Sequence, residues 1–289
     1  MRSFVCLAVW SVALAVVAVV CRPVAGQQDP PDEAKKPYRK LAPGVVQTVD
    51  SKRQLEESFS RHDVVELLAV DQNFDWAKNI PFRRDIWTLD FKFKPVRMIW
   101  VDVPQKGGKM RRKLIWYMVY SVTNPGKTMH PVKAEDGTFK VEYVDQPIRF
   151  IPEFLLESQE FSKAYPDRVI PVALGPIRLR EDRNRRFLTS VEICREINVG
   201  ETVWGVAMWE DVDPRIDRFS VYVQGLTNAY KWKDEPGRFK KGDPIGTGRR
   251  LSRKTLKLNF WRPGDEYFEH EREIRYGIPG EVDYEWVYR

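Results

Sequence analysis

Histidines and clustered acidic residues can bind metal ions or transfer protons. The three histidines, His62, His130 and His270, stand in different segments without a cysteine pair beside them, which argues against zinc. The densest acidic cluster comprises Asp265, Glu266, Glu269, His270, Glu271 and Glu273. Carboxylate oxygens suit calcium, but this spacing matches no recognised calcium loop. We therefore interpret the cluster as a solvated surface, and we expect no metal and no cofactor.

Nucleophilic and phosphate chemistry have no local motif. No G-x-S-x-G elbow is present, and no glycine pattern suits a nucleotide phosphate. Cys194, at the end of the run VEIC, is the single cysteine outside the amino-terminal apolar run, and we expect a small buried side chain there. A pair of carboxylates for glycoside hydrolysis can lie far apart in sequence, so a carbohydrate-acting or other hydrolase stays an alternative. We favour a protein that is not an enzyme.

The stretch 231–257, KWKDEPGRFKKGDPIGTGRRLSRKTLK, holds ten Lys or Arg against three acids. Cations interleaved with aromatic rings suit an anionic polymer. The residues that could form such a patch are Lys231, Trp232, Lys240, Lys241, Arg249 and Arg250. For an exported chain, envelope glycan or anionic lipid headgroups are more plausible partners than nucleic acid. The competing interpretation, which we prefer, is a solvated loop whose rings pack back into the core.

Ten Trp and eleven Tyr raise the question of sugar stacking. Most Trp stand inside strand patterns and are expected in the core: Trp87, Trp100, Trp116, Trp204 and Trp209. Three lie at loops or strand ends, where a ring could be displayed: Trp76, Trp232 and Trp261. These three are the candidates for carbohydrate contact.

The ribbon 87–124 should position all of these residues. Trp87, Leu89, Phe91 and Phe93 alternate with polar residues, which predicts a strand with one buried face. After the turn PQKGGK, the run 115–122 is apolar at both parities, which predicts a central strand covered on both sides. The remaining strands are expected to pack on this ribbon.

Turn residues divide the rest into short strands. We expect a hairpin around Asp136-Gly137, an edge or bulged strand over 148–156, a strand over 187–193, and a hairpin over 204–224 turned at 211–214. Residues 158–186 have connector composition with at most one helical turn. The pattern predicts an all-β, immunoglobulin-like β-sandwich, as one large sandwich or as two packed small ones. The expected lobes are 47–157 and 158–289.

The amino terminus predicts export. Arg2, an apolar run and the exit Pro23-Val24-Ala25-Gly26 indicate a signal peptide over 1–26, and an uncleaved membrane anchor is the alternative. Residues 27–46 are rich in proline and charge, as in a tether. The formal charge of +7 is concentrated in 231–257, and the acidic tail could neutralise it across adjacent strands. We expect a periplasmic or extracellular location.

Three segments carry a resemblance: IWTLDFKFKPVRMIWVDVP, LIWYMVYSVTNPG and WEDVDPRIDRFSVYVQGLTNAY. They resemble uncharacterised exported proteins of the planctomycete type, a resemblance that implies no activity and no site residues. Our hypothesis is an exported, non-catalytic protein acting by binding or assembly in the cell envelope, with envelope glycan, anionic lipid or another envelope protein as partner. A purely structural element, whose exposed edge strand pairs with another subunit, is a further hypothesis.

Overall fold

The computed structural model describes residues 45–49, 85–135, 139–238, 240, 242–244, 247–263 and 273–289. All of them belong to one compact unit, Arg39–Arg289. The predicted signal peptide, residues 27–44 of the predicted tether, and Trp76, His62 and Lys241 lie outside the described residues. So does the acidic cluster, except Glu273. Among the helices described, none has the length and apolar character needed to cross a membrane.

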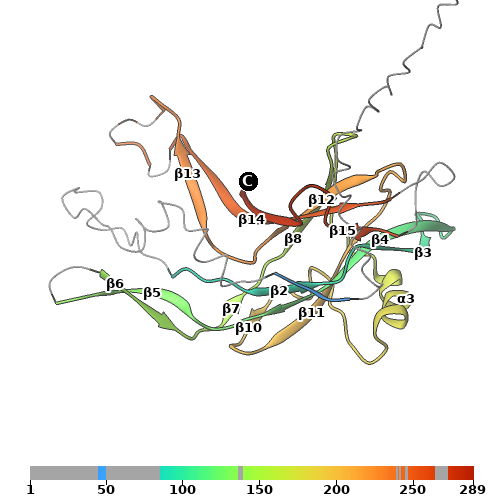
Figure 1. The fold of residues 1–289 in the computed structure, drawn as a ribbon, viewed down its shortest axis with the longest axis horizontal. Helices are drawn as coiled ribbons and strands as arrows, with labels where there is room; N and C mark the ends of the chain where they lie inside the picture. Colours follow the sequence, from blue (N-terminus) through green and yellow to red (C-terminus); the bar gives the residue numbers. More distant parts are fainter. Residues whose placement is uncertain are drawn as a thin grey trace, which may run out of the picture. The chain divides into compact units, whose positions relative to one another are not determined.

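A five-stranded antiparallel sheet contains the predicted ribbon (Figure 1). Its strands are β1 (Gln47–Val49), β2 (Asp90–Phe93), β3 (Arg97–Pro104), β4 (Met110–Thr123) and β11 (Thr202–Trp209). The first arm of the ribbon is divided between β2 and β3, because Pro95 has no N–H to give to a ladder. Both pieces pair with β4, from Asp90 opposite Thr123 to Pro104 opposite Met110. The predicted ribbon is therefore confirmed.

Strand β4 is central, as its sequence predicts. Residues 115–122 are all buried, and β4 pairs with β2 and β3 on one edge and with β11 on the other. Trp116, Met118, Tyr120 and Val122 face the main core between two sheets. The alternate residues Ile115, Tyr117 and Val119 enter a second core beneath a helix. Each face of β4 therefore has its own cover.

That helix is α3 (Pro171–Glu181), and it corrects our prediction of a connector with at most one helical turn over 158–186. Gly175-Pro176 in its middle reads as a break in sequence, yet the helix continues through Pro176. Pro171 occupies the first turn, where its missing N–H costs nothing. Ala173 and Ile177, one turn apart, are fully buried against the outer face of β4. Tertiary packing thus outweighs the local break signal.

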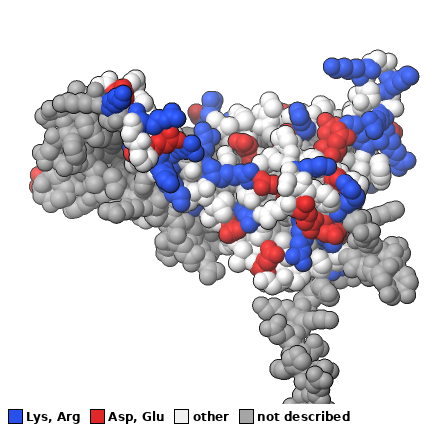
Figure 2. All heavy atoms as spheres, turned by 90° about the horizontal axis from the view of Figure 1, so that it is seen from above, with Lys and Arg blue, Asp and Glu red and all other residues white. Residues whose placement is uncertain are grey.

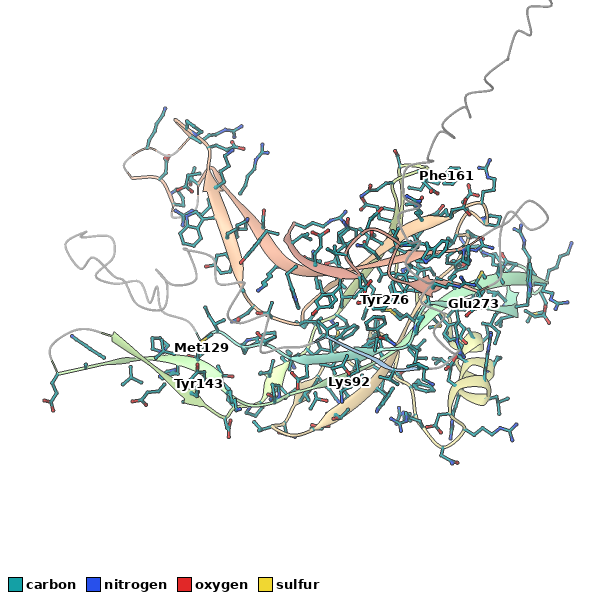
Figure 3. All side chains as sticks on the ribbon, in the orientation of Figure 1. Lys92, Met129, Tyr143, Phe161, Glu273 and Tyr276 are labelled. Atoms are coloured by element: carbon teal, nitrogen blue, oxygen red, sulfur yellow. The ribbon has the colours of Figure 1, made fainter. Side chains whose placement is uncertain are left out.

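A seven-stranded sheet forms the other layer. Its strands are β8 (Glu153–Ser158), β9 (Lys163–Pro166), β12 (Arg218–Gln224), β13 (Tyr230–Asp234), β14 (Arg249–Trp261), β15 (Arg275–Tyr276) and β16 (Tyr284–Tyr288). Aromatic rings join the layers: Tyr120 lies 4.7 Å from Phe154, and Phe93 lies 5.0 Å from Tyr276, which Figure 3 labels. The all-β sandwich is confirmed, while its immunoglobulin-like class stays a prediction.

The predicted hairpin over 204–224 is wrong. Strands β11 and β12 belong to different sheets: β11 pairs with β4, and β12 lies between β8 and β14. The chain between them therefore crosses from one layer to the other. The same pairings join strands from both sides of residue 157, so the lobes expected at 47–157 and 158–289 share both sheets.

The smaller strands complete the fold. A hairpin of β5 (Thr128–Lys133) and β6 (Phe139–Val144) follows the ribbon as predicted, although its turn at 136–138 lies outside the described residues. The alternation over 148–156 gives β7 (Ile148–Arg149), paired with β10 (Glu196–Ile197), and then β8. β8 has partners on both sides, β12 and β9, so it is not the expected edge strand.

The strand expected over 187–193 is also wrong. This segment makes a single bridge, from Leu188 to Gly205, and then turns over Ser190–Ile193. Cys194 follows the turn and is exposed, rather than buried as expected. Of the four residues VEIC, only Ile193 is buried in the core. The run therefore supplies one core side chain and does not form a strand.

Candidate functional site

The predicted anionic patch lies on the β13–β14 hairpin. Lys231 and Trp232 are on β13, Arg249 and Arg250 begin β14, and exposed Lys240 lies in the segment between them. The register places Trp232 opposite Leu251, so the ring and this exposed leucine share one face. The segment thus begins and ends in a strand pair, and the solvated loop of our preferred interpretation corresponds to residues 235–248 between the two strands.

Acids within the same hairpin pair with three of its arginines. Arg249 donates two hydrogen bonds to Asp234, at 2.7 and 3.1 Å, from Nε and Nη2. Arg250 and Arg238 both pair with Glu235. These contacts occupy three of the cations that an anionic ligand would need, and exposed pairs of this kind contribute little to stability.

The aromatic rings of the hairpin are also engaged. The Arg249 guanidinium lies 4.6 Å from the centre of the Trp232 ring, and Tyr230 lies 5.9 Å from the same ring. The Lys231 ammonium lies 4.1 Å from the ring of Tyr288 on β16. Trp261 is half-buried, with the Arg275 guanidinium 5.7 Å from its ring. The two described candidates for sugar stacking therefore carry an arginine over the ring.

The predicted neutralisation between the basic segment and the acidic tail is observed at one pair of strands. Lys257 on β14 lies opposite Glu285 on β16, and its ammonium donates to the Glu285 carboxylate at 2.6 Å. The pKa of Lys257 is raised: burial lowers it, but the hydrogen bond and the charge of Glu285 outweigh burial. The pair ties the edge strand β16 to the sheet.

The carboxylate most perturbed by burial belongs to Asp167, which follows β9. It accepts hydrogen bonds from the Met208 N–H at 2.7 Å and from the Ser190 hydroxyl. Desolvation raises the pKa of Asp167 from 3.8 to about 6, although these hydrogen bonds oppose the shift. Its charge, after desolvation, contributes to a raised pKa of the buried Tyr120 hydroxyl. Asp167 therefore joins β9, β11 and the turn at Ser190, and it titrates near neutral pH.

A second buried carboxylate, Glu181, ends helix α3. It accepts hydrogen bonds from the Tyr117 hydroxyl at 2.7 Å, the Lys94 ammonium at 3.0 Å and the Arg97 guanidinium at 2.8 Å. Burial alone would raise the pKa of Glu181, but these donors and charges lower it overall. Burial also raises the pKa of Tyr117, with the charge of Glu181 as the next cause. The arrangement fastens the helix to β2, β3 and β4.

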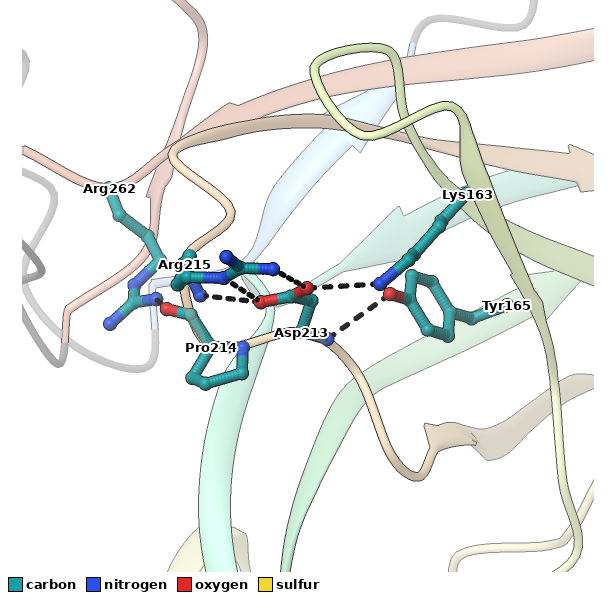
Figure 4. Close-up of polar contacts among 6 residues, drawn as sticks. All are labelled: Lys163, Tyr165, Asp213, Pro214, Arg215 and Arg262. Carbon is teal, nitrogen blue, oxygen red and sulfur yellow. Dashed lines mark hydrogen bonds and ion pairs between the residues drawn. The ribbon is translucent and has the colours of Figure 1, made fainter.

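A third cluster holds the crossing between the sheets (Figure 4). The Asp213 carboxylate accepts from Arg215 at 2.9 and 3.0 Å and from Lys163 at 3.1 Å, and its backbone N–H donates to the Tyr165 hydroxyl. Hydrogen bonds from Arg215 lower the pKa of Asp213 well below its usual range. Arg262 donates to the Pro214 carbonyl at 2.5 Å. The sequence missed this cluster because β9 and β11–β12 are far apart in the chain.

The described residues do not bring a nucleophile to a histidine. The Cys194 thiol donates to the Ser190 carbonyl at 3.2 Å, whereas His130 Nδ1 lies 2.6 Å from an oxygen of Asp85. The Asp85 carboxylate also accepts from Gln146 at 3.0 Å. Among the residues that the structure describes, no group of three His, Cys, Asp or Glu could hold a metal ion. His62 and His270 lie outside that part of the chain.

The tip of the β3–β4 hairpin is a surface that our sequence reasoning missed. Trp100, expected in the core, is 56% exposed, and Met110 is 60% exposed. Four exposed cations surround them: Lys106, Lys109, Arg111 and Arg112. The signal was present in the text PQKGGKMRRK, where four Lys or Arg flank a glycine turn and a fifth, Lys113, follows. Figure 2 shows Lys and Arg gathered at the right of the view, where Figure 1 places this turn.

Comparison of the chain with protein-family models, with curated proteins and with solved structures gives no match. The resemblance to exported proteins of the planctomycete type therefore stays a prediction.

Proposed function

We propose that this protein is an exported, non-catalytic β-sandwich that works by binding or assembly in the cell envelope. The observation that carries the proposal is the course of its two longest strands. In β4, residues 115–122 are buried while 110–112 are exposed, and β14 likewise runs from exposed residues at 250–251 to buried residues at 258–260. Each strand therefore leaves the core and forms one arm of a projecting hairpin (Figure 1).

Projecting hairpins contribute little to the stability of a sandwich. Stabilisation follows the apolar area removed from water, and two strands without a covering layer are marginal by themselves. Recognition, by contrast, commonly uses exposed segments held by a rigid scaffold. The exposed halves of β4 and β14 fit this role, with the sandwich as scaffold.

The buried carboxylates support binding more than catalysis. Glu181 accepts from three donors on neighbouring segments, and Asp213 accepts from Lys163 after the preceding turn and from Arg215 in its own connection. Asp167 is bonded to Met208 and Ser190. These contacts join secondary structures, and each uses the acceptor capacity that a substrate proton or hydroxyl would need.

The partners that fit are envelope glycan, anionic lipid headgroups or another envelope protein. The test uses residues 27–289, which hold the whole compact unit. We expect binding to an acidic polysaccharide or to anionic vesicles that weakens with salt, and no release of sugar from the polysaccharide. Absence of binding to either, or hydrolysis, would overturn the proposal.

A charge-neutralising variant tests whether the β13–β14 hairpin binds the ligand. Neutralising Lys240, Lys241, Arg249 and Arg250 removes four of the five positive charges of the predicted patch. Loss of polysaccharide binding would identify the patch as the site, and unchanged binding would retire it. Export is tested separately, by the amino-terminal sequence of the product recovered outside the inner membrane, which we expect to begin at Gln27.

A further inference from the structure

The tip of the β3–β4 hairpin has one amphipathic face. Directly opposed residues of an antiparallel pair point to the same side, and Asp102 lies opposite Arg112, as Pro104 lies opposite Met110. Trp100 shares this face, with the Arg112 guanidinium 5.6 Å from its ring. The face therefore combines the Trp100 indole ring, the Met110 thioether and the Arg112 guanidinium at the end of the hairpin.

This face is the outward continuation of the inner face of the sandwich. Trp116, farther back on β4, is fully buried and packs on Phe219 of the other sheet at 5.4 Å. Leu114 is only partly buried, and Trp100 and Met110 beyond it are mostly exposed. The apolar alternation of the strands thus continues past the region where the second sheet covers it. Two large apolar side chains are thus displayed on this face next to the Arg112 guanidinium.

The charge of the tip is unbalanced. Between Trp100 and Arg112 there are four cations and one acid, Asp102. Lys106, Lys109, Arg111 and Arg112 make no ion pair within the described part of the chain. The arginines of the β13–β14 hairpin differ, because Asp234 and Glu235 neutralise them. The four cations of the tip are therefore available to an anionic partner.

The root of the hairpin is fixed, so the tip is presented in a defined direction. Lys113 donates to Glu210 and to Asp211, each at 2.9 Å, and so joins β4 to the end of β11. At the far end, Gly107 and Gly108 both have positive φ, and nothing lies within 4 Å of the position a Cβ would take. Because the turn has no side chains at residues 107 and 108, the end of the hairpin can approach a flat surface closely.

We infer that the β3–β4 hairpin tip docks on the surface of an anionic phospholipid bilayer, with Trp100 and Met110 entering the interface and the four cations lying among the headgroups. This inference rests on the proposed function, since it names one partner within it. Tryptophan favours the boundary between water and hydrocarbon, and basic residues near it are attracted to anionic headgroups. The two preferences meet here on one hairpin.

The apolar residues decide between a bilayer and a soluble polyanion. An acidic glycan can attract the cations and can stack on Trp100, but it offers no apolar medium for the Met110 side chain. A bilayer offers that medium, and transfer of exposed apolar surface into it is favourable. Dependence of binding on Met110 is therefore the specific mark of a lipid partner.

The experiment measures the partition of residues 27–289 onto vesicles of phosphatidylcholine mixed with phosphatidylglycerol, and onto pure phosphatidylcholine as reference. The tip variant changes Lys106, Lys109, Arg111 and Arg112 to Ser, and a second variant is Met110→Ser. A control of equal charge changes Lys92, Lys133, Arg149 and Arg168 to Ser, four exposed cations outside both projecting hairpins. Tryptophan fluorescence of the free proteins checks that every variant is folded.

We expect binding to the anionic vesicles only, with about fivefold loss for each cation removed from the tip. Met110→Ser should weaken binding about threefold to tenfold at unchanged charge, while the control should lose little. Equal loss in the tip variant and the control, or an unchanged Met110→Ser, would overturn the inference in favour of bulk charge or a soluble polyanion. If the protein binds polysaccharide but no vesicle, the inference fails and the proposed function stands; if it binds neither, both fail.

Discussion

The Tyr117 hydroxyl donates a 2.7 Å hydrogen bond to the Glu181 carboxylate, joining the central strand to the last residue of the single helix described. The side chain of Glu181 is 1% exposed, and Lys94 and Arg97 reach the same carboxylate from β2 and β3. One buried acid thus links the end of the helix to three residues on the outer face of the five-stranded sheet. Helix α3 supplies the apolar cover beside it.

Replacing Glu181 with Gln should lower the free energy of unfolding by about 2–3 kcal/mol, because two partly buried cations then lose their counter-charge. Urea denaturation followed by tryptophan fluorescence measures the change. Glu196→Gln is the matched control, since Glu196 is exposed on β10, and its effect should stay within about 0.5 kcal/mol. Equal effects of the two substitutions would show that Glu181 contributes no more to the free energy of unfolding than an exposed glutamate does.

Sequence alternation was sufficient for the strands that are long and regular. The alternation over 87–93 and the continuous apolar run 115–122 predicted the ribbon and its central strand. Such patterns are sufficient because the apolar side chains of a strand show which of its faces are buried. The same reasoning could not find α3. Its local text contains Gly175-Pro176, and only the outer face of β4 supplies the apolar partner that makes a helix there.

Strand partners were harder to predict than strands. The segments 202–209 and 218–224 are strands, as expected, but their short connection suggested a hairpin. The real partners, such as Trp116 opposite Trp209, are distant in sequence, and a connection of eight residues serves a crossing between sheets as well as a wide turn. Asp213, with its bonds to Lys163, Arg215 and Tyr165, is the residue that fixes this crossing.

Exposure of a strand residue depends on how far the opposite layer extends. Trp100 and Trp116 both stand in alternating strand text, yet one is mostly exposed and the other fully buried. The extent of the second sheet is a tertiary property that no local pattern contains. For this reason the sequence shows the cations around the β3–β4 turn but not the exposure of Trp100 and Met110 beside them.

Asp167 should give the protein a measurable dependence of stability on pH. Its pKa is raised from 3.8 to about 6, so the folded state holds the proton more tightly than the unfolded state. Stability from this proton is complete below about pH 4 and is lost as the pH rises to about 6. In Asp167→Asn this loss should disappear, so the wild type should fall by about 1–2 kcal/mol more than the variant between these pH values. Parallel profiles in chemical denaturation would contradict the assignment.

Cys194 should react rapidly with a thiol reagent in native buffer. Its side chain is exposed beyond the turn at Ser190, and a free thiol in that position is accessible to a disulfide reagent. We expect one thiol per chain of residues 27–289 to be labelled at a rate close to that in denaturant. Cys194→Ser should remove the signal, and labelling that requires unfolding would place the thiol in the core.

Gly205 leaves room for a ring from the neighbouring strand of the five-stranded sheet. It lies opposite Tyr120, and a Cβ at residue 205 would stand 2.5 Å from the ring carbon Cζ and 2.9 Å from Ile193 Cδ1. Gly205→Ala should therefore lower the free energy of unfolding by about 2 kcal/mol or more, because a fully buried ring must move.

The double-mutant cycle with Tyr120→Leu tests whether this ring is the cause. The shorter side chain removes the Cζ contact, so the added cost of Gly205→Ala should fall by about 1 kcal/mol or more in that background. Urea denaturation of the four proteins provides the four free energies. A strictly additive cycle would mean that Ile193 or the local backbone, rather than Tyr120, requires a glycine at residue 205.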